Sequence, residues 1–436
     1  MDDRNALLKS CLNFIQLLNC LLPKFHKLAS FFLGQGSVQA LNLLTGFLLL
    51  RWLSVEEYAV YALLVSFQGT VSVLVEMGLS GSLTGLLAGR TDKATVGGYI
   101  QTVKRYRSLI FLSTTPLLAI AFAVIFLRQG WGWELGLALL LALLVNTFFL
   151  SWTKYYSVPF LIQHNMAGLY RLEALFAAVR LAGCWFLQVG GVIGAAVVAW
   201  LTALTTTAMG LAYRQQAAPF IEMPRRPDAE KNREVLNFIR PLVPATLFFA
   251  FQGQIGVFLI SWFGKVDAIA EVGALGRISQ IFVMLSAFKT VVIAPYIAKS
   301  PRHLLLRRYL FFFFSALGFC ACVVLAGFSR PDLFIWLIGP NYSQLSADLG
   351  FLLLASCINL TSGLMWSMHS ARKWIFGWTS WLYITTTLVV QLLCIKFIAL
   401  NTVKGILIFS ICTSMAMFFA CMAWAFFGFR KEKGLI

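Results

Sequence analysis

The sequence predicts an all-α membrane protein with about twelve transmembrane helices in two bundles of six. Of the 436 residues, 59% are hydrophobic and only 12% are charged, and the mean hydropathy is +0.80. Soluble domains carry about 25% charged residues, so this chain has too little charge to cover a water-exposed surface. One long polar segment, residues 214–240, divides the apolar sequence into two parts of similar length.

Apolar segments of about 20 residues, the length of a helix that crosses a bilayer, recur along the chain. Before them lies an N-terminal segment, 1–30, in which residues 5–22 place apolar side chains at helical spacing with polar ones opposite. This pattern is typical of an amphipathic helix in the membrane interface, and a signal peptide is the competing interpretation. The spans must be helical, because unpaired backbone groups in hydrocarbon cost several kcal/mol each. We place them at 31–53, 58–87, 108–127, 134–160, 169–188, 192–213, 241–263, 271–296, 309–328, 346–369, 376–396 and 405–427.

The distribution of basic residues predicts the orientation. Of the 35 Lys and Arg residues, 26 fall in segments on one side of the predicted membrane and six on the other. Because basic loops stay in the cytoplasm, we expect both termini there, including the C-terminal tail 428–436. We expect the linker 214–240 in the cytoplasm as well, where it would tether the two halves. Each half (31–213 and 241–427) has an even number of spans, so a pseudo-two-fold axis along the membrane normal would relate the two bundles.

Four short motifs resemble those of one family of transporters. Residues 51–61 (RWLSVEEYAVY) look like an LGPEEYGLY signature, and residues 339–342 (GPNY) are similar to an FGPEY turn. Residues 76–79 (EMGL) resemble an acidic-x-Gly-Leu step that closes the second span, and Pro295 resembles a proline that ends the eighth span. In these motifs the chain resembles the polysaccharide flippases, the O-antigen-type flippases of the multidrug/oligosaccharidyl-lipid/polysaccharide exporter superfamily.

This resemblance implies a MATE-like fold and a transporter, not an enzyme. The substrate would be an undecaprenyl-pyrophosphate-linked oligosaccharide repeat unit for O-antigen, lipopolysaccharide or another surface polysaccharide. It would move from the cytoplasmic to the periplasmic leaflet of the bacterial inner membrane by alternating access. The implied partners are this lipid-linked glycan, the bilayer, and the polymerase and chain-length proteins of the same pathway. No cofactor is implied, and coupling to H⁺ or Na⁺ is left open.

Arg180 is the strongest candidate for a functional residue, because a charge at membrane depth is expensive and is retained for a purpose. It lies near the middle of the span 169–188. We expect its guanidinium to bind phosphate or acidic sugar groups through paired hydrogen bonds. The competing interpretation is a structural pair between helices, with Glu76 or Glu173 as the partner.

Three further ionisable residues lie within predicted spans. Arg277 and Lys289 share the span 271–296 and are expected to bind the substrate as well, unless they snorkel to the span ends. They are twelve residues apart, about 120° around a helix, so at most one is expected to point squarely into a shared cavity. Glu76, in the span 58–87, is a candidate for ion coupling, or else a buried partner for an arginine.

Polar faces on two spans predict further contacts with the substrate. In the first span, three side chains recur on one helical face, and the seventh span carries a polar residue four positions before a glycine. Such faces suit hydrogen bonds to sugars, although they also hold neighbouring spans together. The residues concerned are Gln35, Gln39, Asn42 and Gln252.

Other classes of function find little support in the sequence. The four histidines are not paired with carboxylates at ligand spacing, and the nine cysteines form no CxxC pair, so we expect no metal site. No long loop would house a catalytic domain for a membrane-embedded glycan polymerase or transferase. Scattered basic residues argue against nucleic acid as a partner. An ion-coupled exporter of small molecules or drugs is the remaining alternative.

Overall fold

A computed structural model of the chain forms helices, and no strands, in the part that it describes. The described residues are 33–87, 90, 92–163, 165–224, 228–374, 376 and 378–432. The predicted interfacial segment 1–30 lies outside them.

The N-terminal half supplies six spans. They are the helix Leu33–Trp52, α2 (Val55–Glu76) with α3 (Leu79–Leu86), α4 (Lys93–Arg128), α5 (Trp133–Tyr156) with α6 (Val158–Ile162), α7 (Met166–Val189) and α8 (Ala195–Ala217). The side chain of Ser54 caps α2 by accepting a hydrogen bond from the Glu57 amide at 3.2 Å. α2 ends where Met77 and Gly78 adopt left-handed backbone (φ 38° and 74°), a conformation that favours glycine.

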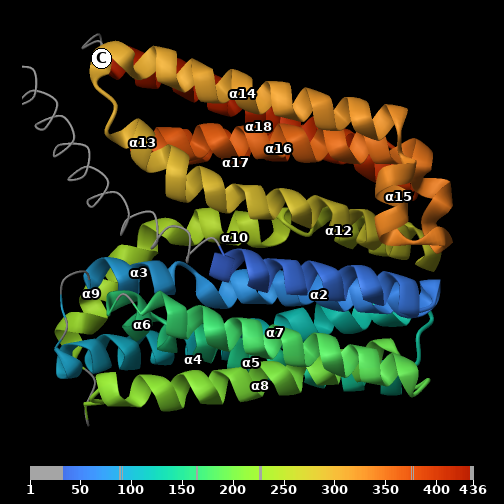
Figure 1. Cartoon of the computed structure of the whole chain (residues 1–436), viewed down its shortest axis with the longest axis horizontal. Coiled ribbons are helices and arrows are strands. Elements are labelled where there is room, and N and C mark those ends of the chain that lie inside the picture. Colours follow the sequence, from blue (N-terminus) through green and yellow to red (C-terminus); the bar gives the residue numbers. More distant parts are fainter. Residues whose placement is uncertain are drawn as a thin grey trace, which may run out of the picture.

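The linker between the halves is docked on the N-terminal half. It contains η1 (Ala218–Phe220), α9 (Ala229–Ile239) and η2 (Arg240–Leu242). The Glu222 amide donates to the Lys93 carbonyl at 3.1 Å, and the Tyr99 hydroxyl of α4 donates to the carboxylate of Glu234 on α9. α9 also packs against α3 and α4, as Figure 1 shows. The free connection to the C-terminal half is therefore shorter than residues 214–240, and it centres on η2.

The C-terminal half supplies the remaining helices. They are α10 (Val243–Gln252), α11 (Ile255–Phe263), α12 (Val266–Phe288), the π-helical turn η3 (Lys289–Ile293), α13 (Ala294–Ala298), α14 (Arg302–Ser329), α15 (Asp332–Ile338), η4 (Pro340–Leu345), α16 (Ser346–Ala371), α17 (Thr379–Phe397) and α18 (Val403–Glu432). The predicted seventh span, 241–263, is broken between α10 and α11 at Gly253 and Gln254. Backbone N–H and C=O groups without a helical partner are tolerated at this depth where they line a polar cavity.

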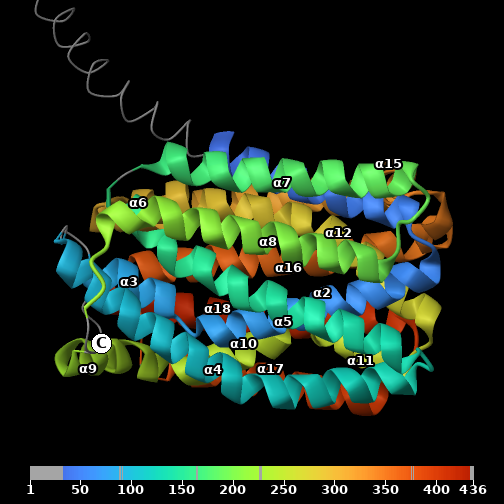
Figure 2. The ribbon, with the colours of Figure 1, turned by 90° about the horizontal axis from the view of Figure 1, so that it is seen from below.

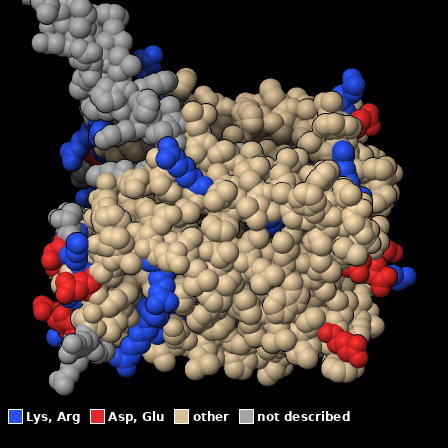
Figure 3. Space-filling model, turned by 60° about the horizontal axis from the view of Figure 1, so that its bottom comes forward, with Lys and Arg blue, Asp and Glu red and all other residues tan. Residues whose placement is uncertain are grey.

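The lengths of the helices and the distribution of charge on the surface are those of a membrane protein. Eleven helices of the described residues are long and apolar enough to cross a membrane. The predicted span 271–296 falls in α12, η3 and α13, and α12 runs alongside the other long helices in Figure 1. Uncharged side chains cover most of the face shown in Figure 3, and charged side chains gather near its two ends. This distribution is that of a lipid-facing belt between two polar surfaces.

The two halves form two bundles, as Figures 1 and 2 show, and a pseudo-two-fold axis along the membrane normal relates them. α2 and α12, the second spans of their halves, form the main contact between the bundles. We call the end that carries α9 the linker end. The opposite end, where Ser54 joins the first span to α2, is the hairpin end.

The two halves share one apolar core toward the hairpin end, whereas each half has a core of its own toward the linker end. One large core contains residues of both halves, such as Ala59 of α2 and Ile269 of α12. At the linker end, the core around Tyr99 belongs to the N-terminal half and the linker. A third core, around Tyr309 and Trp374, belongs to the C-terminal half alone. The bundles are therefore closed against each other at the hairpin end.

Candidate functional site

A cavity of about 970 Å³ lies between the two bundles. Its walls come from the first span, α2, α7 and α8 on one side and from α10 to α12, η3 and α16 to α18 on the other. Six of the seven residues predicted to bind substrate line this cavity: Gln39, Asn42, Arg180, Gln252, Arg277 and Lys289. The seventh, Gln35, is not among the lining residues.

The cavity is cationic. Arg180, Arg277 and Lys289 line it, and no Asp or Glu is among the lining residues that the structure describes. Serine, threonine, asparagine and glutamine side chains complete its polar surface. Within a low-dielectric bundle, unpaired positive charges strongly favour a negatively charged ligand.

Arg180 contacts a neutral partner. Its guanidinium donates a hydrogen bond to Oδ1 of Asn42 on the first span. Its Nε is buried and has no hydrogen-bond partner among the described residues. The structural pair with Glu76 that the sequence also suggested is not formed, because Glu76 lies against another arginine. Arg180 therefore lines the cavity without a carboxylate partner among the described residues.

Arg277 is held by residues of both bundles. Only 9% of its surface is exposed. Its Nε donates to the hydroxyl of Tyr58 on α2 at 3.2 Å, and its Nη1 to Oε1 of Gln280 at 3.3 Å. The guanidinium carbon lies 5.6 Å from the ring centroid of Tyr61. Gly46 leaves room for this side chain, since a Cβ there would lie 3.3 Å from the Arg277 Cδ.

Lys289 reaches the same cavity as Arg277. It is the first residue of η3, and its Nζ lies against Gly363 of α16. Both cations therefore line the cavity that the prediction gave squarely to at most one of them. The helical angle between the two Cα positions does not limit a lysine, because its long flexible stem carries the ammonium around the helix.

The predicted polar face of the seventh span is partly used for packing. Oε1 of Gln252 accepts a hydrogen bond from Nε2 of the buried Gln391 on α17 at 2.7 Å. Among the described residues, its own Nε2 donates no hydrogen bond. Ser279 and Ser356, which face each other at 3.0 Å across α12 and α16, add hydroxyl groups that the sequence did not single out.

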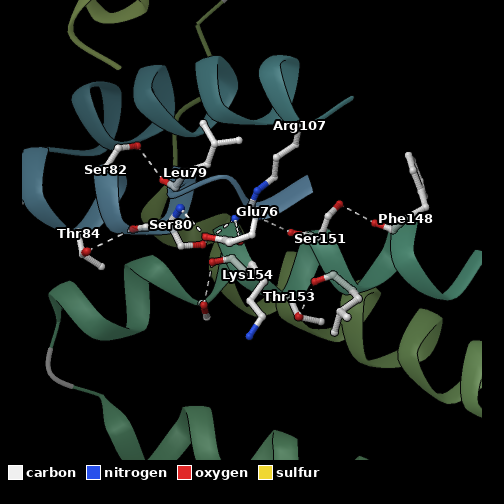
Figure 4. Close-up of polar contacts among 12 residues, drawn as sticks. Glu76, Leu79, Ser80, Ser82, Thr84, Arg107, Phe148, Ser151, Thr153 and Lys154 are labelled. Atoms are coloured by element: carbon white, nitrogen blue, oxygen red, sulfur yellow. Dashed lines mark hydrogen bonds and ion pairs between the residues drawn. The ribbon is translucent and has the colours of Figure 1, made fainter. Parts of the chain in front are cut away.

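Glu76 lies apart from the residues that line the cavity. It forms an ion pair with Arg107 of α4 (Figure 4), whose side chain is 2% exposed. Arg107 also donates to Oγ of Ser80 at 2.6 Å and to the Ser151 carbonyl at 2.9 Å. The other carboxylate oxygen of Glu76 accepts from the Ser80 amide at 2.7 Å. This geometry agrees with the second interpretation, a buried partner for an arginine, while the role of Glu76 in ion coupling stays a prediction.

Two sequence motifs from opposite halves meet at the hairpin end. Arg51 donates to the Trp336 carbonyl and lies beside Gly339. The rings of Tyr58 and Tyr342 pack edge to face with centroids 6.2 Å apart. From the sequence, Arg51 and Tyr58 belong to one motif of the resemblance, and Gly339 and Tyr342 belong to another. Nothing else in the sequence indicated that these two motifs lie together.

Four side-chain hydrogen bonds connect the two bundles in the described residues, and all lie toward the hairpin end. We call this set the hairpin-end seal. It consists of Arg51 to the Trp336 carbonyl, Tyr58 to the Gly273 carbonyl at 3.4 Å, Gln129 to the Ser261 carbonyl at 2.7 Å, and Arg277 to Tyr58.

No protein-family model and no curated protein matches the sequence. The fold, in contrast, is similar to that of solved transporters. A multidrug resistance MATE family transporter of the MOP superfamily in an inward-facing conformation aligns with 91% of this chain and 95% of its own, with a TM-score of 0.65 and 16% identity.

Two further structures show the same likeness. The lipid II flippase MurJ, in an inward closed conformation, aligns with 91% of this chain and 86% of its own (TM-score 0.68, 12% identity). A MOP superfamily transporter from Pyrococcus furiosus, described as having a binding pocket of reverse polarity, aligns with 93% and 94% (TM-score 0.60, 15% identity). The chain thus has the helical fold that MATE transporters and MurJ share.

Proposed function

We propose that the protein is a flippase for a lipid-linked oligosaccharide whose head group carries a diphosphate. The observation that carries this proposal is the charge of the cavity, which has three cations and no carboxylate among its described lining residues. A diphosphate brings negative charge that such a cavity would hold without a counter-ion. The fold supports a transporter, because the solved structures that it resembles include a lipid flippase.

Each group of lining residues has a part in this proposal. Arg180, Arg277 and Lys289 bind the diphosphate or acidic sugars, the arginines through paired charge-assisted hydrogen bonds. Gln39, Asn42 and the free amide of Gln252 bind sugar hydroxyls. The polyprenyl tail stays in the bilayer and passes between the first span and α10. We propose undecaprenyl as the lipid carrier and a surface polysaccharide as the final product. The polymerase and the chain-length proteins of the same pathway are the proposed protein partners.

The proposed direction is from the cytoplasmic to the periplasmic leaflet of the inner membrane. The linker end carries most of the basic loop residues and would lie in the cytoplasm with both termini. The closed hairpin end would then be periplasmic, and this conformation is one that receives substrate from the cytoplasm. Transport requires the hairpin-end seal to open while the bundles close at the linker end.

A drug exporter is the second candidate, and the likeness to multidrug MATE transporters favours it equally. The cavity distinguishes the two by charge. A site for cationic drugs needs carboxylates, whereas this cavity would repel cations. An exporter with this cavity would therefore handle anions.

Deletion of the gene in its native cell tests the proposal. We expect surface polysaccharide to disappear and lipid-linked repeat units to accumulate in the cytoplasmic leaflet, with both defects restored by the wild-type gene. Sensitivity to dyes and drugs should not change. Increased drug sensitivity with normal surface polysaccharide would favour the exporter and reject the flippase.

A further inference from the structure

We propose that Tyr58 links the occupancy of the cavity to the hairpin-end seal, and that an anion bound by Arg277 releases Tyr58 and so loosens the seal. This inference rests on the proposed function, because it takes the cavity to be an anion site. It assigns a positioning role to a residue for which the sequence predicted none.

The Tyr58 hydroxyl takes part in the cavity and in the seal at once. Its oxygen accepts from Nε of Arg277 at 3.2 Å, and its proton is donated to the Gly273 carbonyl of α12 at 3.4 Å. The side chain is 0% exposed, so its hydroxyl depends on these two protein partners. A buried hydroxyl that loses one partner is costly to keep in place.

The Tyr58 ring packs where the bundles approach most closely. A Cβ on Gly273 would lie 2.5 Å from the Ala62 Cβ and 3.3 Å from Cε1 of Tyr58, so α2 and α12 are in direct contact here. The ring of Tyr342, which is also 0% exposed, packs against the ring of Tyr58. Movement of Tyr58 would disturb this packing from both halves.

Arg277 is suited to exchange Tyr58 for an anion. The phenol is a neutral acceptor, and hydrogen bonds from a guanidinium to phosphate oxygens are roughly twice as strong as those between neutral groups. A phosphate that binds through Nε and one Nη of Arg277 occupies the position of the Tyr58 hydroxyl. Arg51 and Gln129, which make the two bonds of the seal that do not involve Tyr58, do not line the cavity. The bond from Arg277 to Tyr58 is thus the part of the seal that an anion in the cavity reaches directly.

Amide hydrogen exchange read by mass spectrometry tests this link on the purified full-length protein, with inorganic pyrophosphate as the probe. We expect pyrophosphate to raise exchange several-fold in residues 56–62, 270–276 and 339–345 of the wild type. Tyr58→Phe, which keeps the ring and removes the hydroxyl, should show this raised exchange without pyrophosphate and little further change with it. Tyr296→Phe makes the same chemical change at an exposed tyrosine of α13 and should behave as the wild type.

The outcomes separate the link from the proposed function. If calorimetry shows that pyrophosphate binds while exchange at the hairpin end stays unchanged, the link is wrong and the anion site stands. If pyrophosphate does not bind at all, both the anion site and the link are wrong. Unchanged exchange in Tyr58→Phe also overturns the link, and the wild-type comparison with and without pyrophosphate needs no variant to fold.

Discussion

Arg180 of α7 donates a hydrogen bond to Asn42 of the first span, and both residues line the cavity. An amide oxygen orients the guanidinium without neutralising it, whereas a carboxylate would do both. The first span therefore positions a cation of the fifth span and leaves its charge available to a ligand.

A carboxylate at position 42 should weaken anion binding. Asn42→Asp pairs Arg180 with a negative charge, so we expect the affinity for inorganic pyrophosphate to fall at least tenfold, about 1.4 kcal/mol. Isothermal titration calorimetry on purified protein measures this change. Asn42→Ala removes the hydrogen bond but adds no charge, and its affinity should stay within about threefold of the wild type. Equal losses in the two variants would contradict the role of charge.

The ion pair between Glu76 and Arg107 should contribute to stability. Glu76→Ala leaves the buried Arg107 guanidinium without its counter-charge, so we expect the free energy of unfolding to fall by about 3 kcal/mol. Thermal unfolding in detergent gives the comparison. Glu134→Ala removes an exposed carboxylate of α5 and should change stability by less than about 0.5 kcal/mol. Similar melting curves for the two variants would show that the pair is not structural.

The same carboxylate allows a test of ion coupling. If Glu76 binds the coupling ion, Glu76→Gln should make transport in proteoliposomes independent of H⁺ and Na⁺ gradients, because the neutral amide does not titrate. Lys154 of α5, which Figure 4 draws together with this pair, offers a control: Lys154→Gln removes a charge and should keep the dependence on the gradient. Gradient-dependent transport by Glu76→Gln would leave Glu76 with its structural role alone.

The span boundaries explain why the sequence paired Glu76 with the wrong arginine. Hydropathy begins the third span at residue 108 and leaves Arg107 in a loop, but α4 starts at Lys93. A helix continues into water when its N-terminus is capped, here by Asp92, whose side chain accepts from the Thr95 amide at 2.8 Å. The apolar pattern marks where lipid begins, not where the helix begins.

The three cations of the cavity could be predicted from the sequence alone. Arg180, Arg277 and Lys289 stand out because lipid excludes charge, a rule that needs no contact information. The role of Tyr58 could not be predicted in the same way. A tyrosine in a span is unremarkable by itself, and its partners Gly273 and Arg277 lie more than 200 positions away in the sequence. Only the packing of α2 on α12 brings them together.

Docking of the linker on the N-terminal half should depend on Gly97. A Cβ at this position would overlap the Glu222 carbonyl oxygen, a backbone atom that has no side-chain freedom to move away. We expect Gly97→Ala to release residues 221–224 and to speed cleavage after Glu222 by a glutamate-specific protease several-fold.

A glycine in open space provides the matched control for this change. Gly81 of α3 has nothing within 4 Å of an added Cβ, so Gly81→Ala should be cleaved at the wild-type rate. Wild-type cleavage of Gly97→Ala would mean that the linker does not need this close approach to α4.

The central claim is that the cationic cavity carries a lipid-linked glycan through its anionic head group. The most direct test measures lipid-linked glycan in the periplasmic leaflet of cells that express Arg180→Ala at the wild-type protein level. We predict a loss of at least tenfold, with Arg180→Lys, which keeps the charge, retaining more transport than Arg180→Ala. Wild-type amounts of glycan in that leaflet with Arg180→Ala would contradict the claim.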